Sequence, residues 1–81
     1  MRISVTVEDI ERGRRDDYLD CPISRAVKRA TGTKLCKTYT KTMILRGNTY
    51  LLPMEARCFV WAFDRGEDVE PFEFELEMEA L

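Results

Sequence analysis

The side chains that could carry chemistry in this chain are carboxylates and thiols, because its 81 residues include no histidine. A Ser-His-Asp triad, a Cys-His pair and a His-ligated metal are therefore excluded within the chain. Cys21, Cys36 and Cys58 are widely spaced and form no Cys-x-x-Cys pair, so they indicate neither a disulfide framework nor a zinc ribbon. Cys21 precedes a predicted helix start, which favours a thiolate, but no partner base accompanies it. We expect no catalytic residue, no cofactor and no enzymatic activity.

Carboxylates are concentrated near the carboxyl end. After Glu67-Asp68-Val69-Glu70-Pro71, the residues Phe72, Phe74, Leu76 and Met78 alternate with glutamates. This alternation predicts a strand with an apolar face and a carboxylate face, on which the glutamates lie about 6.6 Å apart. The candidate partner-binding residues are Glu67, Asp68, Glu70, Glu73, Glu75, Glu77 and Glu79.

Two interpretations of this acidic strand remain open. Its glutamates form a linear array of negative charge with a period resembling that of phosphates, which a groove built to bind DNA could accept. Alternating glutamates also protect an exposed sheet edge from aggregation and keep a protein soluble. The additional acids before the strand exceed what edge protection requires, since like charges on neighbouring positions repel.

The charges divide the chain into a basic part and an acidic part. Residues 1–50 carry eleven basic and six acidic side chains, net +5, whereas residues 51–81 carry two basic and nine acidic, net −7. A nucleic-acid site is one reading of the basic part, formed by Arg12, Arg14, Arg15, Arg25, Lys28, Arg29, Lys34 and Lys37. Interspersed acids and a net charge of −2 argue against it, so we expect no direct nucleic-acid partner.

The acidic loop at Asp16, Asp17 and Asp20 is a second candidate, for a cation. This loop lacks the glycine and the distal glutamate of an EF-hand loop. A solvated loop with a helix cap explains the three aspartates, so we expect no metal site. The four glycines are isolated from one another, so the sequence contains no glycine-rich loop of the kind that binds phosphate.

The elements that position these residues follow from periodicity and capping. Period two predicts strands at 3–7, 35–39, 42–45, 49–52 and from residue 72, with a turn at Arg46-Gly47-Asn48. Gly13 stops a short acidic helical turn at 8–12. One helix begins at Asp20 or Cys21 and ends at Gly32, and another runs over 54–64 and is capped by Gly66. The order β-α-β-β-α-β predicts one α+β domain over residues 1–81, with two helices on one face of a mostly antiparallel sheet of four to five strands.

The composition, 44% hydrophobic and 35% charged, is typical of an ordered soluble protein. No window has the roughly 18 apolar residues of a membrane span, and the first residues lack the apolar stretch of a signal peptide. We expect a cytoplasmic protein without a membrane partner, present as a monomer or small homo-oligomer.

The chain also resembles a group of small uncharacterised proteins encoded by bacteriophages and prophages. The resemblance rests on Val5-Thr6-Val7, Asp9-Ile10, Gly13, Cys21-Pro22-Ile23, Ala26, Leu52-Pro53, Phe63-Asp64, Gly66 and Pro71-Phe72-Glu73-Phe74. It spans nearly the whole chain, but its motifs are structural and carry no catalytic signature. Small acidic phage proteins include inhibitors of host defence, among them anti-CRISPR proteins, several of which act as DNA mimics. The resemblance implies a cytoplasmic role in the bacterial host cell.

From the strand and the resemblance together, we expect a phage-encoded inhibitory binding protein, with an anti-CRISPR protein as its specific form. Its acidic strand would occupy the basic groove of a host protein or nucleoprotein complex, such as a CRISPR surveillance complex. The alternative is a phage accessory or assembly protein without an inhibitory role, which self-associates through the apolar helix at 54–64 and a sheet edge.

Overall fold

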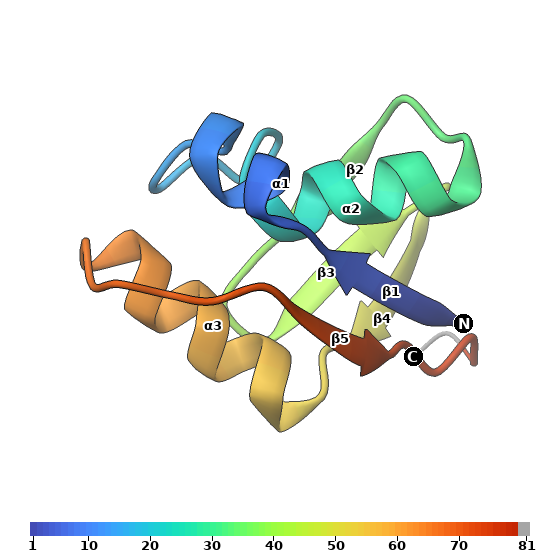
Figure 1. Ribbon diagram of the computed structural model, residues 1–81. Coiled ribbons are helices and arrows are strands. Elements are labelled where there is room, and N and C mark those ends of the chain that lie inside the picture. The colour runs from blue at the N-terminus through green and yellow to red at the C-terminus, as the bar shows by residue number, and fades with distance from the viewer. Residues whose placement is uncertain (80–81) are drawn as a thin grey trace.

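The computed structural model describes residues 1–79, which form three helices and five strands (Figure 1). The elements follow one another along the chain as β1 (Arg2–Val5), α1 (Val7–Arg12), α2 (Pro22–Thr31), β2 (Cys36–Thr38), β3 (Thr42–Leu45), β4 (Asn48–Leu51), α3 (Met54–Asp64) and β5 (Phe72–Glu75). All strand pairs are antiparallel. The predicted α+β class is confirmed.

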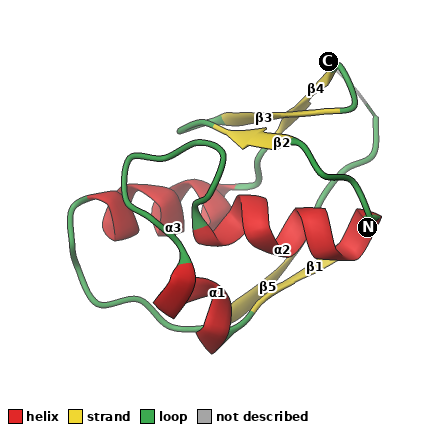
Figure 2. Cartoon of the chain, turned by 90° about the horizontal axis from the view of Figure 1, so that it is seen from above, coloured by secondary structure: helices red, strands yellow, loops and turns green. Residues whose placement is uncertain are grey.

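The strands form two sheets, so the prediction of a single sheet is wrong. The first and last strands pair as β1-β5, and the middle strands form the sheet β2-β3-β4. Figure 2 shows α2 and α3 lying between the two sheets rather than on one face of a single sheet. Five of the first six residues of α2 are buried, and this helix contacts both β1 and β2. A helix buried over so wide a face needs cover from two sides, which a single sheet cannot supply.

The local signals for helix boundaries are largely confirmed. Cys21 caps α2, Pro22 is its first residue, and Gly32 ends it with a φ of 73°. Helix α3 has the predicted bounds, and Gly66 follows its end with a φ of 80°. The first strand is shorter than predicted because Thr6 caps α1: its hydroxyl accepts a hydrogen bond from the amide of Asp9.

The hairpin between β3 and β4 turns one residue earlier than predicted. Leu45 pairs with Asn48, so the loop consists of Arg46 and Gly47 alone, with φ values of 54° and 80°. Two consecutive residues with positive φ match the right-handed twist of the strands. Asn48, predicted as part of the turn, is instead the first residue of β4.

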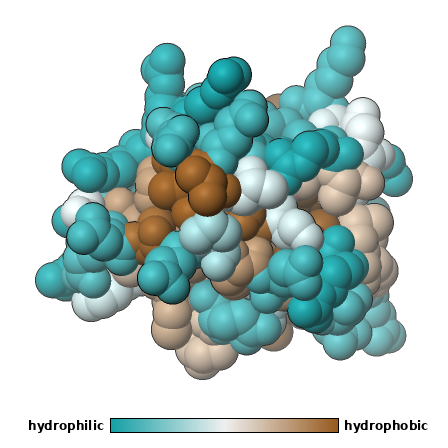
Figure 3. All heavy atoms as spheres, viewed as in Figure 1, coloured by the Kyte–Doolittle hydropathy of each residue, from teal (hydrophilic) through white to brown (hydrophobic). Residues whose placement is uncertain are grey.

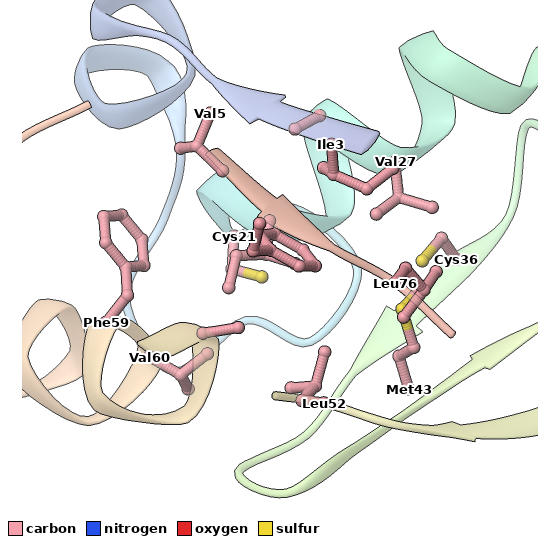
Figure 4. Packing of buried hydrophobic residues seen from close by; sticks show 14 of the residues in the cluster. Ile3, Val5, Cys21, Val27, Cys36, Met43, Leu52, Phe59, Val60 and Leu76 are labelled. Atoms are coloured by element: carbon pink, nitrogen blue, oxygen red, sulfur yellow. The ribbon is translucent and has the colours of Figure 1, made fainter. Parts of the chain in front are cut away.

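The core lies between the sheets and is closed by α2 and α3. Ile3, Val5, Ile23, Val27, Phe59, Phe63, Phe74 and Leu76 all belong to one buried cluster, whereas Val7 is exposed. Figure 4 shows side chains from both sheets and from both helices pointing into this interior. Phe72 is half-buried, and its ring stacks on that of Phe59 with 4.7 Å between the ring centroids.

A buried ion pair joins α1 to α2. Asp9 is fully buried, and its two carboxylate oxygens accept hydrogen bonds of 2.7 Å from the guanidinium of Arg29. Asp9 also accepts a hydrogen bond from the amide of Thr6. Burial alone would raise the pKa of Asp9, but these hydrogen bonds outweigh it, so the pKa lies below its ordinary value.

The longest helix, α3, has 11 residues, and no helix within residues 1–79 combines the length and apolar character that crossing a bilayer requires.

Candidate functional site

Strand β5 places its glutamates on the outside of the β1-β5 pair, which lies at the front in Figure 1. Phe74 pairs with Ile3, and both side chains are buried. Successive side chains of a strand point to opposite faces, so Glu73 and Glu75, on either side of Phe74, face solvent. All seven candidate residues are exposed: Glu67, Asp68, Glu70, Glu73, Glu75, Glu77 and Glu79. The predicted separation of an apolar face from a carboxylate face therefore holds through residue 77.

The regular strand is shorter than the sequence indicates. Strand β5 ends at Glu75, and the amide of Leu76 donates one more hydrogen bond to the carbonyl of Met1 at 2.8 Å. Met78, predicted on the apolar face, is 44% exposed. The prediction of an extended strand through residue 79 is wrong, since β5 ends at Glu75 and residues 76–78 have no regular secondary structure.

Glu73 is neutralised by groups on β1. One of its oxygens accepts hydrogen bonds of 3.1 Å from Nε and from a terminal nitrogen of Arg2, and the other accepts one of 3.0 Å from the hydroxyl of Ser4. The hydrogen bonds from Ser4 and Arg2 lower the pKa of Glu73. A basic partner would have to displace Arg2 to gain the full charge of this carboxylate.

Glu75 is neutralised in a similar way. Its carboxylate binds the amino-terminal ammonium of Met1 at 2.5 Å, and this hydrogen bond lowers the pKa of Glu75. The sequence treats the strand glutamates as equivalent. The structure distinguishes them, because the two in β5 have cationic partners, Arg2 on β1 and the ammonium of Met1 just before it.

The other five candidates differ in their surroundings. Glu67 forms an ion pair of 3.0 Å with Nε of Arg65. Within residues 1–79, no cationic nitrogen lies within 4 Å of the carboxylates of Asp68, Glu70, Glu77 or Glu79. The uncompensated charge therefore lies at the two ends of the acidic segment, before and after β5.

A further group of carboxylates, which the sequence analysis did not connect to these, lies at the end of α3. The amide of Asp16 donates a hydrogen bond of 3.0 Å to Asp64, which is 48 residues away in sequence. Around this contact is an open pocket of about 250 Å³, lined by Asp16, Asp17, Tyr18, Cys21, Thr38, Tyr39, Thr40, Val60 and Asp64. Only the tertiary fold brings these segments together, so no local sequence signal could have found the pocket.

Two exposed apolar areas accompany the charged ones. On the outer side of α3, Met54, Cys58 and Trp61 follow one another at helical spacing and are exposed. The guanidinium carbon of Arg65 lies 4.1 Å from the centre of the Trp61 ring. Figure 3 shows a second apolar area near the middle of the front face, surrounded by hydrophilic residues.

The three thiols differ in exposure, since Cys58 is exposed on α3 and the other two are buried. Cys21 and Cys36 are buried, and burial raises the pKa of the Cys36 thiol. The Cys21 sulfur accepts a hydrogen bond from the amide of Ser24, as a cap of α2. Among residues 1–79, no three Cys, Asp or Glu side chains converge as metal ligands would.

No protein-family model matches the chain, and neither the search of curated proteins nor that of solved structures finds a significant match.

Proposed function

We propose that the protein is a non-catalytic binding protein whose acidic segment, residues 67–79, engages the basic groove of a protein or nucleoprotein partner. The observation that supports this most directly is a set of four exposed carboxylates that have no cationic partner among residues 1–79: Asp68, Glu70, Glu77 and Glu79. Lysine and arginine side chains lining a DNA-binding groove carry the complementary charge. Occupation of such a groove would exclude the nucleic acid, so the specific form that we propose is an inhibitor, with a CRISPR surveillance complex as target.

The ion pairs on the two-stranded β1-β5 sheet indicate which carboxylates of this inhibitor would attract a partner. Glu73 and Glu75 are already compensated by Arg2 and the amino-terminal ammonium. They would add little to attraction at a distance, because a partner meets an ion pair there rather than a bare charge. Long-range attraction would come from the acids on either side, and it would be fast and sensitive to salt.

The test is competition against DNA. The protein is titrated into target-DNA binding reactions of purified CRISPR surveillance complexes of several types, and release of labelled DNA is measured. We expect release by the wild-type protein, with an apparent affinity that falls steeply between about 50 and 200 mM salt. Absence of release from every complex, at low salt and at protein in large excess, would refute the inhibitory form of the proposal.

A matched pair of variants isolates the role of the uncompensated charges. Glu77→Gln with Glu79→Gln and Glu73→Gln with Glu75→Gln each remove two negative charges from the same segment. We expect the first pair to weaken binding about three- to thirty-fold, as the loss of two exposed ion pairs would, and the second pair to weaken it less. Equal effects of the two pairs would show that the internal ion pairs do not shield the strand. No effect of either pair, with increased light scattering, would favour edge protection.

The second candidate is the self-associating accessory protein, favoured by the exposed stripe of Met54, Cys58 and Trp61 on α3. Trp61 and Met54 are 57% and 65% exposed, which is unusual for large apolar side chains so close together. Sedimentation equilibrium of the wild type and of Trp61→Gln tests it. A dimer that dissociates in the variant would support self-association, and a monomer at all concentrations would exclude it.

A further inference from the structure

The pocket beside Tyr18 and Tyr39 is the feature outside the acidic segment whose chemistry points to a ligand. We propose that this pocket binds an arginine side chain of the basic partner. The inference rests on the proposed function for the identity of the partner, but the pocket itself is argued from its own aromatic and acidic residues. It assigns a specific chemical contact to one point of an interface that is otherwise defined only by charge.

Two tyrosines form the aromatic part of the pocket. The rings of Tyr18 and Tyr39 stack with 5.5 Å between centroids and 19° between planes. The side chains nevertheless remain 46% and 40% exposed. An exposed stack of two flat rings offers a face on which a planar guanidinium can lie, with a favourable interaction between the cation and the ring electrons. The protein already uses this contact elsewhere, where Arg65 lies over Trp61.

Buried hydrogen bonds hold the two tyrosines in place. The carbonyl of Tyr18 accepts hydrogen bonds from the amide of Thr38 at 2.9 Å and from the hydroxyl of Ser24 at 2.7 Å. The hydroxyls of Ser24 and Thr38 are themselves 2.7 Å apart, and both side chains are buried. Because Tyr39 follows Thr38, the same network fixes the backbone beside both rings, which also stack on each other. The aromatic surface is therefore organised before a ligand arrives, which lowers the entropic cost of binding.

The charge of the ligand follows from the carboxylates around the rings. Asp16, Asp17 and Asp64 line the same pocket, and none of them has a cationic nitrogen within 4 Å among residues 1–79. The buried floor, which includes Cys21 and Val60, contributes no positive charge. Uncompensated negative charge beside an aromatic surface selects a cation over a neutral or anionic group.

An organic cation fits this pocket better than a metal ion. The three carboxylates do not converge as ligands of one ion within the part of the chain that the structure describes. A guanidinium has five donors spread over a plane, so it can bind separate carboxylates and still stack on a ring. Lysine concentrates its charge in a compact, strongly hydrated ammonium, which gains less from a flat aromatic face. The pocket is therefore assigned to arginine.

The test uses three small probes that differ only in the side-chain group: the blocked amides of arginine, lysine and citrulline. Citrulline is the neutral counterpart of arginine with nearly the same shape. Each probe is titrated into the full chain while amide and aromatic resonances are followed by nuclear magnetic resonance. We expect millimolar binding of the arginine probe that shifts resonances of Tyr18, Tyr39, Thr38 and Thr40, weaker binding of lysine, and none of citrulline.

Site variants connect these shifts to the proposed contacts. Tyr39→Leu removes an exposed ring, and Asp64→Asn removes a charge while its side-chain oxygen can still accept the hydrogen bond from the Asp16 amide. Each should weaken arginine binding about three- to tenfold. Glu73→Gln with Glu75→Gln serves as the control for loss of negative charge elsewhere and should leave the pocket titration unchanged.

The outcomes separate this inference from the proposed function. Equal binding of citrulline, equal binding of lysine, or shifts confined to residues 67–79 would overturn the arginine pocket. Tighter binding of a free polyamine than of any arginine-containing peptide would overturn its assignment to a partner. If Tyr39→Leu leaves DNA release intact while Glu77→Gln with Glu79→Gln abolishes it, the proposed function stands and the pocket plays no part. If the arginine probe binds in the pocket but no complex releases DNA, the arginine site stands without the proposed target.

Discussion

Replacement of Asp9 by asparagine tests the buried link between α1 and α2. Asp9 is fully buried and accepts both of its short hydrogen bonds from Arg29, together with one from the amide of Thr6. Asparagine has the same shape, but it replaces one of the accepting oxygens by an NH₂ group. This group would face donors, so at least one charge-assisted hydrogen bond is lost and the helix cap is weakened.

The magnitude follows from the exposure of the two partners. Hydrogen bonds to charged groups contribute about 1.5–3 kcal/mol each. The Arg29 side chain is 52% exposed, so it recovers hydration when its partner changes, and the loss is smaller than for a fully buried pair. We expect Asp9→Asn to lower the free energy of unfolding by about 2–3 kcal/mol at pH 7. That is a large share of the roughly 4–12 kcal/mol typical of a chain of this length.

The same link predicts a pH dependence. The pKa of Asp9 is lower in the folded protein than its value of about 3.9 in an unfolded chain. The stabilisation is therefore complete above about pH 5 and is lost as the pH falls through the folded pKa. The difference in stability between the wild type and Asp9→Asn should accordingly shrink between about pH 5 and pH 2. The pKa values of Glu73 and Glu75 are also lowered, so these residues contribute to the pH dependence of the wild type as well. Only the difference in stability between the wild type and Asp9→Asn isolates the contribution of Asp9.

The assay is urea unfolding followed by circular dichroism at several pH values. Glu8→Gln is the matched control, because Glu8 forms an exposed ion pair with Arg12 on the same helix, and it should cost less than about 0.5 kcal/mol. A loss below about 0.5 kcal/mol for Asp9→Asn at pH 7, or a difference that does not change with pH, would refute the reasoning.

Four further predictions concern the core, two glycines and a helix cap. Phe74 is 1% exposed, so Phe74→Ala should lower the free energy of unfolding by about 3–5 kcal/mol in the same assay, and a change below about 1 kcal/mol would mean that this side chain packs loosely. A Cβ atom at Gly13 would lie 2.7 Å from a backbone oxygen of α1 and from a proline ring carbon of α2, so Gly13→Ala should cost about 1–3 kcal/mol. At Gly32 an added Cβ atom would meet nothing within 4 Å, but the φ of 73° is unfavourable for alanine. Gly32→Ala should therefore lower the free energy of unfolding by about 1–2 kcal/mol. Cys21→Ser should shift the thermal midpoint only modestly and leave any binding activity intact, since serine also caps a helix; loss of activity in a folded variant would revive a chemical role for the thiol.

Helix boundaries could be predicted from the sequence because single residues determine them. Pro22 and Gly32 act through the backbone dihedral angles that they permit, and both lie where the periodicity of α2 begins and ends. The alternation of Phe74 with its neighbouring glutamates was equally readable, because strand periodicity needs no knowledge of the rest of the fold.

The sheet arrangement and the state of the acidic strand could not be predicted in this way. Each depends on which strands become neighbours, and a pattern within one strand carries no such information. In the β1-β5 register, Arg2 lies opposite Glu75 and Ser4 lies opposite Glu73. The hydrogen bond from Arg2 to Glu73 is therefore a diagonal contact between the two strands, and it depends on this register. The pocket at Asp16 and Asp64 likewise depends on a loop and a helix end meeting in the folded chain.

The pairing of the first strand with the last has a consequence for synthesis on the ribosome. Ile3 and Val5 pair with Phe74 and Phe72, which are synthesised many residues later. The nascent chain must therefore carry β1 without its partner strand until β5 has been synthesised. The long segment between β1 and β5 must also close into a loop before these two strands can pair, which slows folding. A truncated product that stops after α3 would expose β1 as an unpaired edge, so premature termination should yield an aggregation-prone fragment rather than a smaller folded protein.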